Sequence, residues 1–332
     1  MTAPPRLERH DLDAARRTVD AVATAFSHKV VGQVQLRESL LVSLLSGGHL
    51  LLESVPGLAK TTAARVIAES VHGGFRRIQC TPDLLPSDII GTQIFEAATN
   101  SFVTQLGPVH ANIVLLDEIN RSSAKTQSAM LEAMEERQTT IAGVEYPIPE
   151  PFLVIATQNP VDQEGTYPLS EAQTDRFMLK EIVGYPSADD EVEVISRMDA
   201  GVYDRTHRSA PVVGLDDIRH AQRVTAAVHM DRVLIQYASR LVEVTRFPDD
   251  LLPPAVARLV EYGASPRATI AFCRTARAVA VLGGRDHVLP DDVAAVAHRV
   301  LRHRLILGFE AATARVTPDV VVDAVLGAVR VP

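Results

Sequence analysis

A lysine and a threonine close a loop between a predicted strand and a predicted helix. The strand is the apolar run His49–Glu53, the loop is Ser54–Ala59, and the helix begins at Lys60 and Thr61. In a loop of this kind, backbone N–H groups and the positive end of the helix bind phosphate groups. The lysine then reaches the β- and γ-phosphates, and the threonine hydroxyl ligates Mg²⁺. The segment therefore predicts a nucleotide site.

The match to the phosphate-loop pattern GxxxxGK[ST] is imperfect. Ser54 and Ala59 replace both pattern glycines, and Gly57 lies between them. If either position required a positive φ, the missing glycine would cost about 1 kcal/mol and weaken nucleotide binding. The chain has only four lysines among its 33 basic residues, so a lysine at this position is not the default cation. An ordinary strand–turn–helix junction with a surface lysine remains the alternative for this segment alone.

Two carboxylates and one amide follow the ends of other predicted strands. The apolar run Ile113–Leu116 is followed by Asp117 and Glu118, and the run Phe152–Thr157 is followed two residues later by Asn159. With a phosphate loop upstream, Asp117 would help to hold Mg²⁺, and Glu118 would be the base that polarises an attacking water. Asn159 would orient that water. Without the loop, these residues would be solvated strand ends and a turn.

The predicted elements favour an α/β fold. Short apolar strands at His49–Glu53, Phe75–Cys80, Ala111–Leu116 and Phe152–Thr157 alternate with helical stretches such as Ser122–Arg137. This alternation predicts a mostly parallel sheet with helices on both faces.

Two hairpins are predicted to project from this core, because their strands lack the apolar content of central ones. One pairs Gln93–Phe95 with Phe102–Thr104, and the other pairs Thr139–Ile141 with Val144–Tyr146.

The chain divides by composition into four predicted parts. An N-terminal helix that packs on the core occupies 1–30, and a nucleotide-binding core with the two hairpins occupies 31–185. A Pro- and Gly-containing junction follows at 186–214. The last part, 215–332, is predicted to be all-helical, since cap-plus-proline helix starts recur in it at Ser265-Pro266 and Thr317-Pro318.

Composition excludes several classes of protein. The net charge is −8 and no basic stripe is visible, which disfavours nucleic acid as the main partner. The two cysteines, Cys80 and Cys273, cannot form a disulfide framework. No N-terminal apolar segment resembles a signal peptide, and no apolar run approaches the ~20 residues that span a bilayer. We therefore expect a cytoplasmic protein without direct membrane binding.

Five segments, in this order, resemble those of AAA+ ATPases, and in particular of the MoxR family. They are Glu53–Thr62, Leu115–Arg121, Ala156–Pro160, Ser170–Phe177 and Gly263–Ala268. The resemblance covers about residues 12–328. It implies the AAA+ fold, a P-loop αβα sandwich with a parallel sheet, followed by a small all-helical lid domain.

The resemblance also implies a role for each matching residue. Lys60 and Thr61 match Walker A, Asp117 and Glu118 match Walker B, Asn159 matches sensor 1, Arg176 matches an arginine finger that serves the neighbouring subunit's nucleotide, and Arg267 matches the sensor 2 arginine of a lid helix. Pro56, Gly57, Leu58, Ala59 and Thr62 would complete the nucleotide-binding loop, and Val31, Gly32 and Gln33 would lie near the adenine.

Both arginines have a simpler alternative. Arg176 could form a surface ion pair with Asp175, its neighbour in the chain. Arg267 could be solvated in the first turn of its helix, although a cation is unfavourable at that end.

The function implied by the resemblance is ATP hydrolysis in a hexameric ring that remodels, matures or activates protein clients. ATP or ADP and Mg²⁺ would be bound, the two hairpins would face the ring pore, and a protein with a von Willebrand factor A domain would be a partner. Three alternatives stay open. They are a nucleotide-binding scaffold whose loop has decayed at Ser54, a DNA-directed AAA+ motor, and a P-loop kinase for a small molecule.

Overall fold

The computed structural model describes residues 7–55, 58, 60–159, 166–203 and 211–332. It separates the chain into two compact units that are discontinuous in sequence. The sheet unit comprises Thr18–Leu169 and Glu181–Arg219, and the helical unit comprises Met1–Arg17, Ser170–Lys180 and His220–Pro332.

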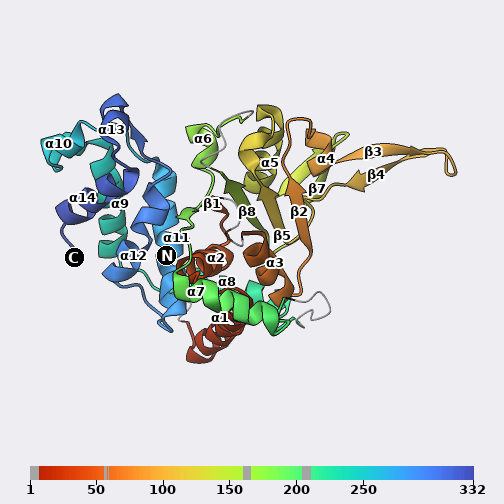
Figure 1. Ribbon diagram of the computed structural model, residues 1–332, viewed down its shortest axis with the longest axis horizontal. Helices are drawn as coiled ribbons and strands as arrows, with labels where there is room; N and C mark the ends of the chain where they lie inside the picture. The colour runs from red at the N-terminus through yellow and green to blue at the C-terminus, as the bar shows by residue number, and fades with distance from the viewer. Residues whose placement is uncertain (1–6, 56–57, 59, 160–165, 204–210) are drawn as a thin grey trace, which may run out of the picture. The chain divides into compact units, whose positions relative to one another are not determined.

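A five-stranded sheet forms the centre of the sheet unit (Figure 1). Its strand order is β2-β5-β8-β1-β9. The bounds are β1 Leu50–Glu53, β2 Phe75–Gln79, β5 Ile113–Asp117, β8 Leu153–Gln158 and β9 Leu179–Ile182. The pairs β1–β8, β5–β8 and β2–β5 are parallel. Strand β5 is buried along its whole length, as expected of a central parallel strand with both faces covered.

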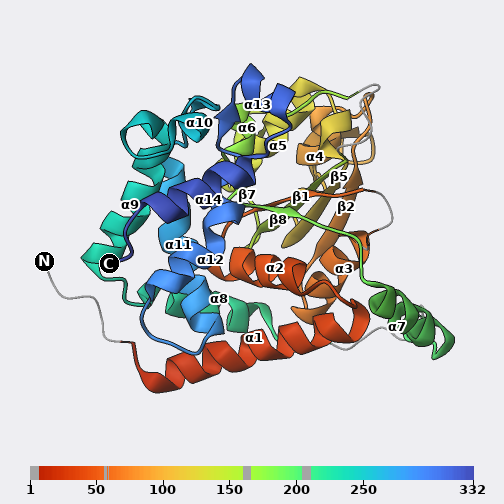
Figure 2. The same ribbon diagram turned by 60° about the vertical axis from the view of Figure 1, so that its left-hand side comes forward.

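Helices flank this sheet (Figure 2). Helix α2 (Val34–Ser46) packs against β1, and helix α3 (Lys60–Ser70) packs against β2 and β5. Gly47, with φ 64°, ends α2 in the left-handed conformation that glycine adopts without strain. The remaining helical elements that belong wholly or partly to this unit are α1 Arg9–Lys29, α4 Pro86–Ile90, η1 Ile119–Arg121, α5 Ala124–Glu136, α7 Ala188–Asp199 and α8 Leu215–Ala227.

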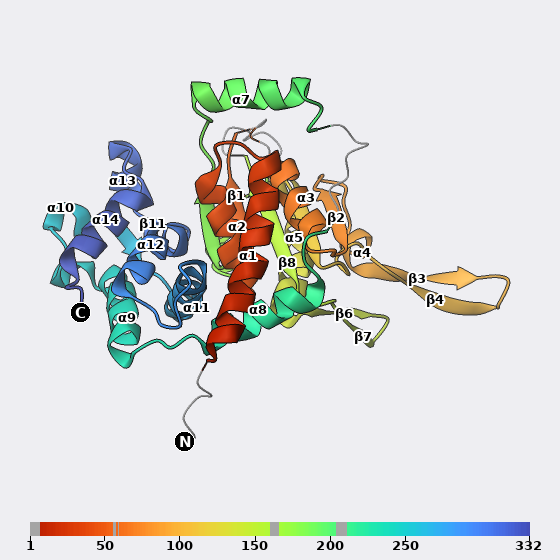
Figure 3. The same ribbon diagram turned by 90° about the horizontal axis from the view of Figure 1, so that it is seen from below.

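Two antiparallel hairpins extend from the sheet unit (Figures 1 and 3). The longer one pairs β3 (Gly91–Glu96) with β4 (Ser101–Leu106), and the shorter one pairs β6 (Gln138–Ile141) with β7 (Val144–Pro147). Both coincide with the predicted hairpins. The longer hairpin carries apolar side chains that are about half exposed, namely Ile94, Phe95, Phe102, Val103 and Leu106.

Four helices form the body of the helical unit. They are α9 Arg232–Arg246, α11 Pro266–Leu282, α12 Pro290–Leu301 and α14 Pro318–Ala328. Both α9 and α12 pack against each of the other three. The predicted cap-plus-proline starts are present, with Ser265 as the N-cap of α11 and Thr317 as that of α14. Smaller elements are α6 Glu171–Thr174, η2 Pro248–Asp250, α10 Pro254–Ala257 and α13 Phe309–Ala314. This unit also contains an antiparallel two-stranded sheet of β10 (Val260–Tyr262) and β11 (Ile306–Leu307). The all-helical prediction for 215–332 did not include these strands.

The predicted domain boundaries are continuous in sequence, whereas the compact units are not. Ser170–Lys180, which composition places in the core, belongs to the unit that contains the helical part. In the part of the chain that the structure describes, no helix is long and apolar enough to cross a membrane.

A buried histidine predicts how the stability of the sheet unit depends on pH. His49 precedes β1, accepts a hydrogen bond from the Val154 N–H at 3.0 Å and donates one to the Met134 carbonyl at 3.2 Å. Burial, assisted by the charge of Arg137, lowers the pKa of His49 from 6.5 to about 4. As the pH falls below 6.5, His49 is therefore protonated in the unfolded chain but stays neutral in the folded chain. The free energy of unfolding consequently decreases toward pH 4.

Replacing His49 with glutamine removes this titration. We expect wild type to lose about 2 kcal/mol more of its unfolding free energy than the variant between pH 7.5 and pH 4.5. Urea unfolding at several pH values measures this difference, with His10→Gln as an exposed control. Equal pH dependence in wild type and His49→Gln would contradict the assignment.

Candidate nucleotide site

The predicted site residues of the sheet unit follow three adjacent parallel strands. Register pairs Glu53 of β1 with Gln158 of β8, and Leu116 of β5 with Ala156 of β8. The loop after β1, the carboxylates at the end of β5 and Asn159 after β8 therefore converge at one edge of the sheet. In open α/β sheets, ligands bind at this carboxyl edge.

Lys60 is the cation of this edge. It begins α3, and its Nζ donates a hydrogen bond to the Ser54 carbonyl at 3.2 Å. Burial lowers the pKa of Lys60, and the charges of Asp117 and Glu118 oppose that shift. The ammonium group therefore lies within electrostatic reach of both carboxylates, as phosphate binding beside them would require.

The Asp117 carboxylate is held from two sides. Arg77 of β2 forms an ion pair with its Oδ2 atom at 2.6 Å, and the Thr157 hydroxyl donates to its Oδ1 atom at 2.9 Å. Because a carboxylate offers about four lone-pair sites, these two partners leave Asp117 able to accept further ligands.

Glu118 has an unusual backbone. Its φ of 58° and ψ of 54° lie in the left-handed region, and its N–H donates to the Thr157 hydroxyl at 2.8 Å. Non-glycine residues in this region cost of order 1–3 kcal/mol and cluster at functional sites. The side chain is paired with Arg121 at 2.9 Å. Since both partners are partly exposed, this ion pair is weak and can exchange.

The loop itself is described only in part. Pro56, Gly57 and Ala59 lie outside the described residues, and Leu58 is buried. Ser54 is buried and is absent from the described non-glycine residues with positive φ. The backbone at Ser54 therefore does not require glycine, so the expected strain does not arise there. Thr61 and Thr62 lie in the first turn of α3.

The segment predicted to lie near adenine borders a cavity of about 210 Å³. Gly32 and Gln33 line it, together with Val34–Leu36 of α2 and Glu181–Tyr185 at the end of β9; Val31 is not among the lining residues. Gly32 has φ 70°, and a Cβ built on it would lie 2.4 Å from the carboxyl carbon of Asp190. The positive φ therefore favours glycine at position 32.

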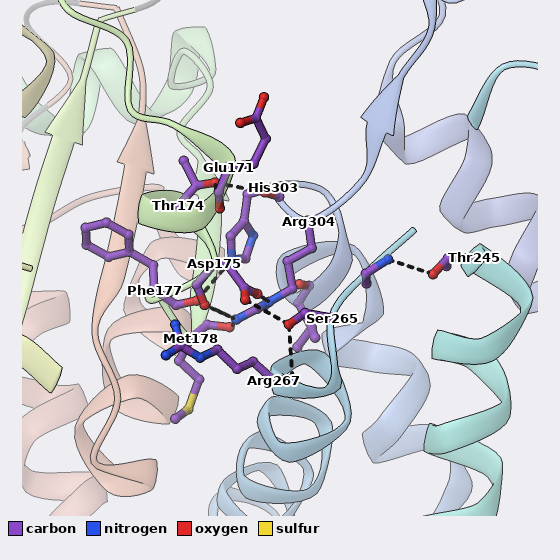
Figure 4. Close-up of polar contacts among 12 residues, drawn as sticks. Glu171, Thr174, Asp175, Phe177, Met178, Thr245, Ser265, Arg267, His303 and Arg304 are labelled. Carbon is purple, nitrogen blue, oxygen red and sulfur yellow. Dashed lines mark hydrogen bonds and ion pairs between the residues drawn. The ribbon is translucent and has the colours of Figure 1, made fainter. Parts of the chain in front are cut away.

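Arg176 and Arg267 lie in the helical unit. Arg176 is half-buried in the turn between α6 and β9, and Arg267 is the second residue of α11. The carboxylate of Asp175 binds Arg304 and Ser265 (Figure 4).

Two models of known protein families match the chain. The family model described as ATPase family associated with various cellular activities (AAA) matches residues 49–179. A second model, AAA lid domain, matches residues 254–325. The first match spans the carboxyl-edge residues and Arg176, and the second spans Arg267.

Relatives extend the similarity over nearly the whole chain. Chaperone MoxR1 of Mycobacterium tuberculosis is 46% identical over 97% of this chain and 84% of its own length. Protein MoxR of Paracoccus denitrificans is 32% identical over 93% of this chain and 94% of its own. The chain belongs to the MoxR family of AAA+ ATPases. The crystal structure of a candidate ATPase from Cytophaga hutchinsonii superposes on this MoxR family member with a TM-score of 0.90, at 41% identity and 97% coverage of both chains.

Sequence reasoning missed three polar residues of this MoxR family member. Arg77 reaches Asp117 because β2 and β5 are neighbours, although 40 residues separate the two in sequence. Thr157 contacts both Asp117 and Glu118, and Arg304 binds Asp175. For Arg77, the available sequence signal was a basic residue inside a predicted strand, which favours an ion pair with a neighbouring strand.

Proposed function

We propose that this MoxR family member hydrolyses ATP in a homo-oligomeric ring and uses the energy to remodel or activate protein clients. One observation carries the proposal. Lys60, Asp117, Glu118 and Asn159 converge at the carboxyl edge of three adjacent strands, with Lys60 within electrostatic reach of both carboxylates. This is the charge arrangement that phosphoryl transfer to water requires.

Each residue has a defined task in this proposal. Lys60 neutralises charge on the β- and γ-phosphates. Glu118 leaves its weak pair with Arg121, polarises the attacking water and takes its proton. Asn159 orients that water. Arg267, and Arg176 from the neighbouring subunit, neutralise the charge that develops on the γ-phosphate oxygens.

The residues present fit Mg²⁺. The ion prefers hard oxygen ligands and is usually held by one or two protein oxygens together with substrate phosphates and water. The hydroxyl of Thr61 and the carboxylate of Asp117 are such donors. Among the described residues, no cluster of three or more carboxylate, imidazole or thiol groups could hold a metal without the nucleotide. When bound, Mg²⁺ would supply positive charge to the β- and γ-phosphates.

ADP or ATP binding is supported by the cavity of about 210 Å³ beside Gly32 and Gln33. The proposal of protein clients is supported by the β3–β4 hairpin. Its exposed Phe95 and Phe102 rings pack edge-to-face, with ring centroids 5.4 Å apart. Exposed apolar groups that gather in one place mark interaction surfaces. A partner with a von Willebrand factor A domain remains part of the proposal through the family resemblance alone.

The test is the ATP hydrolysis rate as a function of protein concentration. A site completed by a neighbouring arginine needs assembly, so the rate per subunit should rise with concentration and level off when the ring is complete. Sedimentation in the same buffer reports the assembly state. A near-zero rate at every concentration, with ADP bound, would contradict hydrolysis and favour the nucleotide-binding scaffold.

A further inference from the structure

We propose that Asp175 is a positioning residue that holds Arg176 and the start of the Arg267 helix as one rigid block. The inference rests on the proposed function, in which these two arginines act on nucleotide. Asp175 itself is assigned no contact with substrate. All residues of the argument belong to the helical unit.

The Asp175 carboxylate is shared between two elements (Figure 4). Its Oδ1 atom accepts a hydrogen bond from Nε of Arg304 at 2.8 Å, and its Oδ2 atom accepts one from the Ser265 hydroxyl at 2.8 Å. Ser265 is the N-cap of α11, and the same hydroxyl accepts from the Arg267 N–H at 3.1 Å. One carboxylate therefore connects the residue before Arg176 with the backbone of Arg267.

Arg304 fixes the turn that contains Arg176. Its side chain is 2% exposed and donates to the Asp175 carbonyl at 3.2 Å, the Phe177 carbonyl at 2.6 Å and the Met178 carbonyl at 3.2 Å. These carbonyls lie on both sides of Arg176. A guanidinium is suited to this task because it presents five donors in a rigid plane.

The turn that carries Arg304 adds further bonds to the same segment. The His303 ring donates to the Phe177 carbonyl at 3.0 Å, and the Thr174 hydroxyl donates to the His303 carbonyl at 3.3 Å. Burial and the charge of Arg304 lower the pKa of His303 well below its ordinary value, so the ring is neutral at neutral pH. The segment around Arg176 is thus held by hydrogen bonds from Arg304 and His303, although Nδ1 of His303 is buried without a hydrogen-bond partner among the described residues.

The start of α11 is fixed on its other side by α9. The Ala264 N–H donates to the buried Thr245 hydroxyl at 2.9 Å, and Nε of Arg246 donates to the Ala264 carbonyl at 2.8 Å. A Cβ on Gly263 would lie 2.3 Å from the Thr245 carbonyl, so the backbone approach itself requires glycine. While α9 fixes one side, the Ser265 hydroxyl links the start of α11 to the Arg176 turn through Asp175.

The consequence is a mechanical link between two nucleotide sites. In the proposed ring, Arg267 acts on the nucleotide of its own subunit and Arg176 on that of the neighbour. Because Asp175 joins them, a displacement of one moves the other. A misplacement of about 1 Å at a reacting centre can cost 10²-fold in rate.

The first test replaces Asp175 with asparagine, which keeps the shape and removes the charge. We expect the hydrolysis rate at saturating ATP to fall by about 10- to 100-fold, with ADP affinity within about threefold of wild type. The loss should be strongly non-additive with Arg176→Lys, because both changes act on the same arginine. A rate within twofold of wild type, or full additivity with Arg176→Lys, would overturn the proposal.

The second test changes Ser265, in case Asp175→Asn does not fold. Ser265→Gly keeps an acceptable N-cap but removes the hydroxyl, whereas Ser265→Thr keeps both. We expect Ser265→Gly to follow Asp175→Asn with a smaller loss, and Ser265→Thr to stay near wild type. Asp231→Gly, which removes the N-cap side chain of α9 away from this network, is the matched control. An equal rate loss in Ser265→Gly and Asp231→Gly would show that Ser265 acts only as a helix cap. That result would contradict its proposed role in connecting Asp175 to Arg267.

Hydrogen exchange separates this inference from the proposed function, because it needs no turnover. In Asp175→Asn and Ser265→Gly, amides of 173–178 and 264–268 should exchange faster, while those of α14 should not change. Unchanged exchange together with normal hydrolysis would overturn the inference and leave the proposed function intact. If the variants exchange faster but the wild-type protein does not hydrolyse ATP, the positioning role of Asp175 is supported and the proposed function is contradicted.

Discussion

Replacing Arg176 with alanine is expected to lower the ATP hydrolysis rate by about 10³-fold or more while ADP still binds. A finger arginine supplied by a neighbouring subunit is worth about 10³–10⁵ in rate, because it neutralises charge that develops only in the transition state. Ground-state binding does not need that charge, so affinity should change little. Phosphate release and ADP titration measure the two quantities.

The control for this substitution is Arg258→Ala. Arg258 belongs to the same unit, is 67% exposed and pairs with Glu310 at 3.4 Å, so its removal should leave the rate unchanged. A mixing experiment then shows where Arg176 acts. Arg176→Ala and Glu118→Gln subunits are combined in equal amounts. In randomly mixed rings, about a quarter of the interfaces then pair an intact Glu118 from one subunit with an intact Arg176 from its neighbour. Failure of the mixture to regain activity would exclude a finger acting between subunits.

Replacing Glu118 with glutamine should have the second largest effect. The amide cannot take a proton from water, so we expect hydrolysis to fall by about 10²- to 10⁴-fold while ATP remains bound. Folding should be nearly unaffected, because the lost pair with Arg121 is partly exposed and worth about 1 kcal/mol at most. Single-turnover hydrolysis and gel filtration with bound ATP measure these effects.

Glu136→Gln, at the exposed end of α5, is the matched control for the same chemical change. It should retain the wild-type rate. If Glu118→Gln also retained that rate, Glu118 would not be the base, and the role of the β5 carboxylates would fall to Asp117.

Local signals predicted most elements of the sheet unit. The strands β1, β5 and β8 were visible as short apolar runs because both faces of these parallel strands are buried. Strand β2 carries two arginines and is largely exposed, so its signal was weaker. Helix starts were visible where a cap residue precedes proline, as at Ser265. The order of the strands was not visible, because pairing depends on contacts between residues far apart in the chain.

The sequence by itself determined the family and predicted the chemistry. Lys60 at a helix start, Asp117 and Glu118 after an apolar strand, and Asn159 after another are local patterns, and their order along the chain indicated the AAA+ family. It also indicated the arginines, Arg176 and Arg267, through the motifs around them.

Tertiary structure alone decided how these residues are held. Arg77 reaches Asp117 because two strands are neighbours. From the next strand, the Thr157 hydroxyl binds the Asp117 carboxylate and the Glu118 backbone N–H. Asp175, Ser265 and Arg304 meet although 90 or more residues separate Asp175 from either of the others. Side chains so distant in sequence are brought together only by packing, since no local pattern of residue types encodes which buried donor will meet which acceptor.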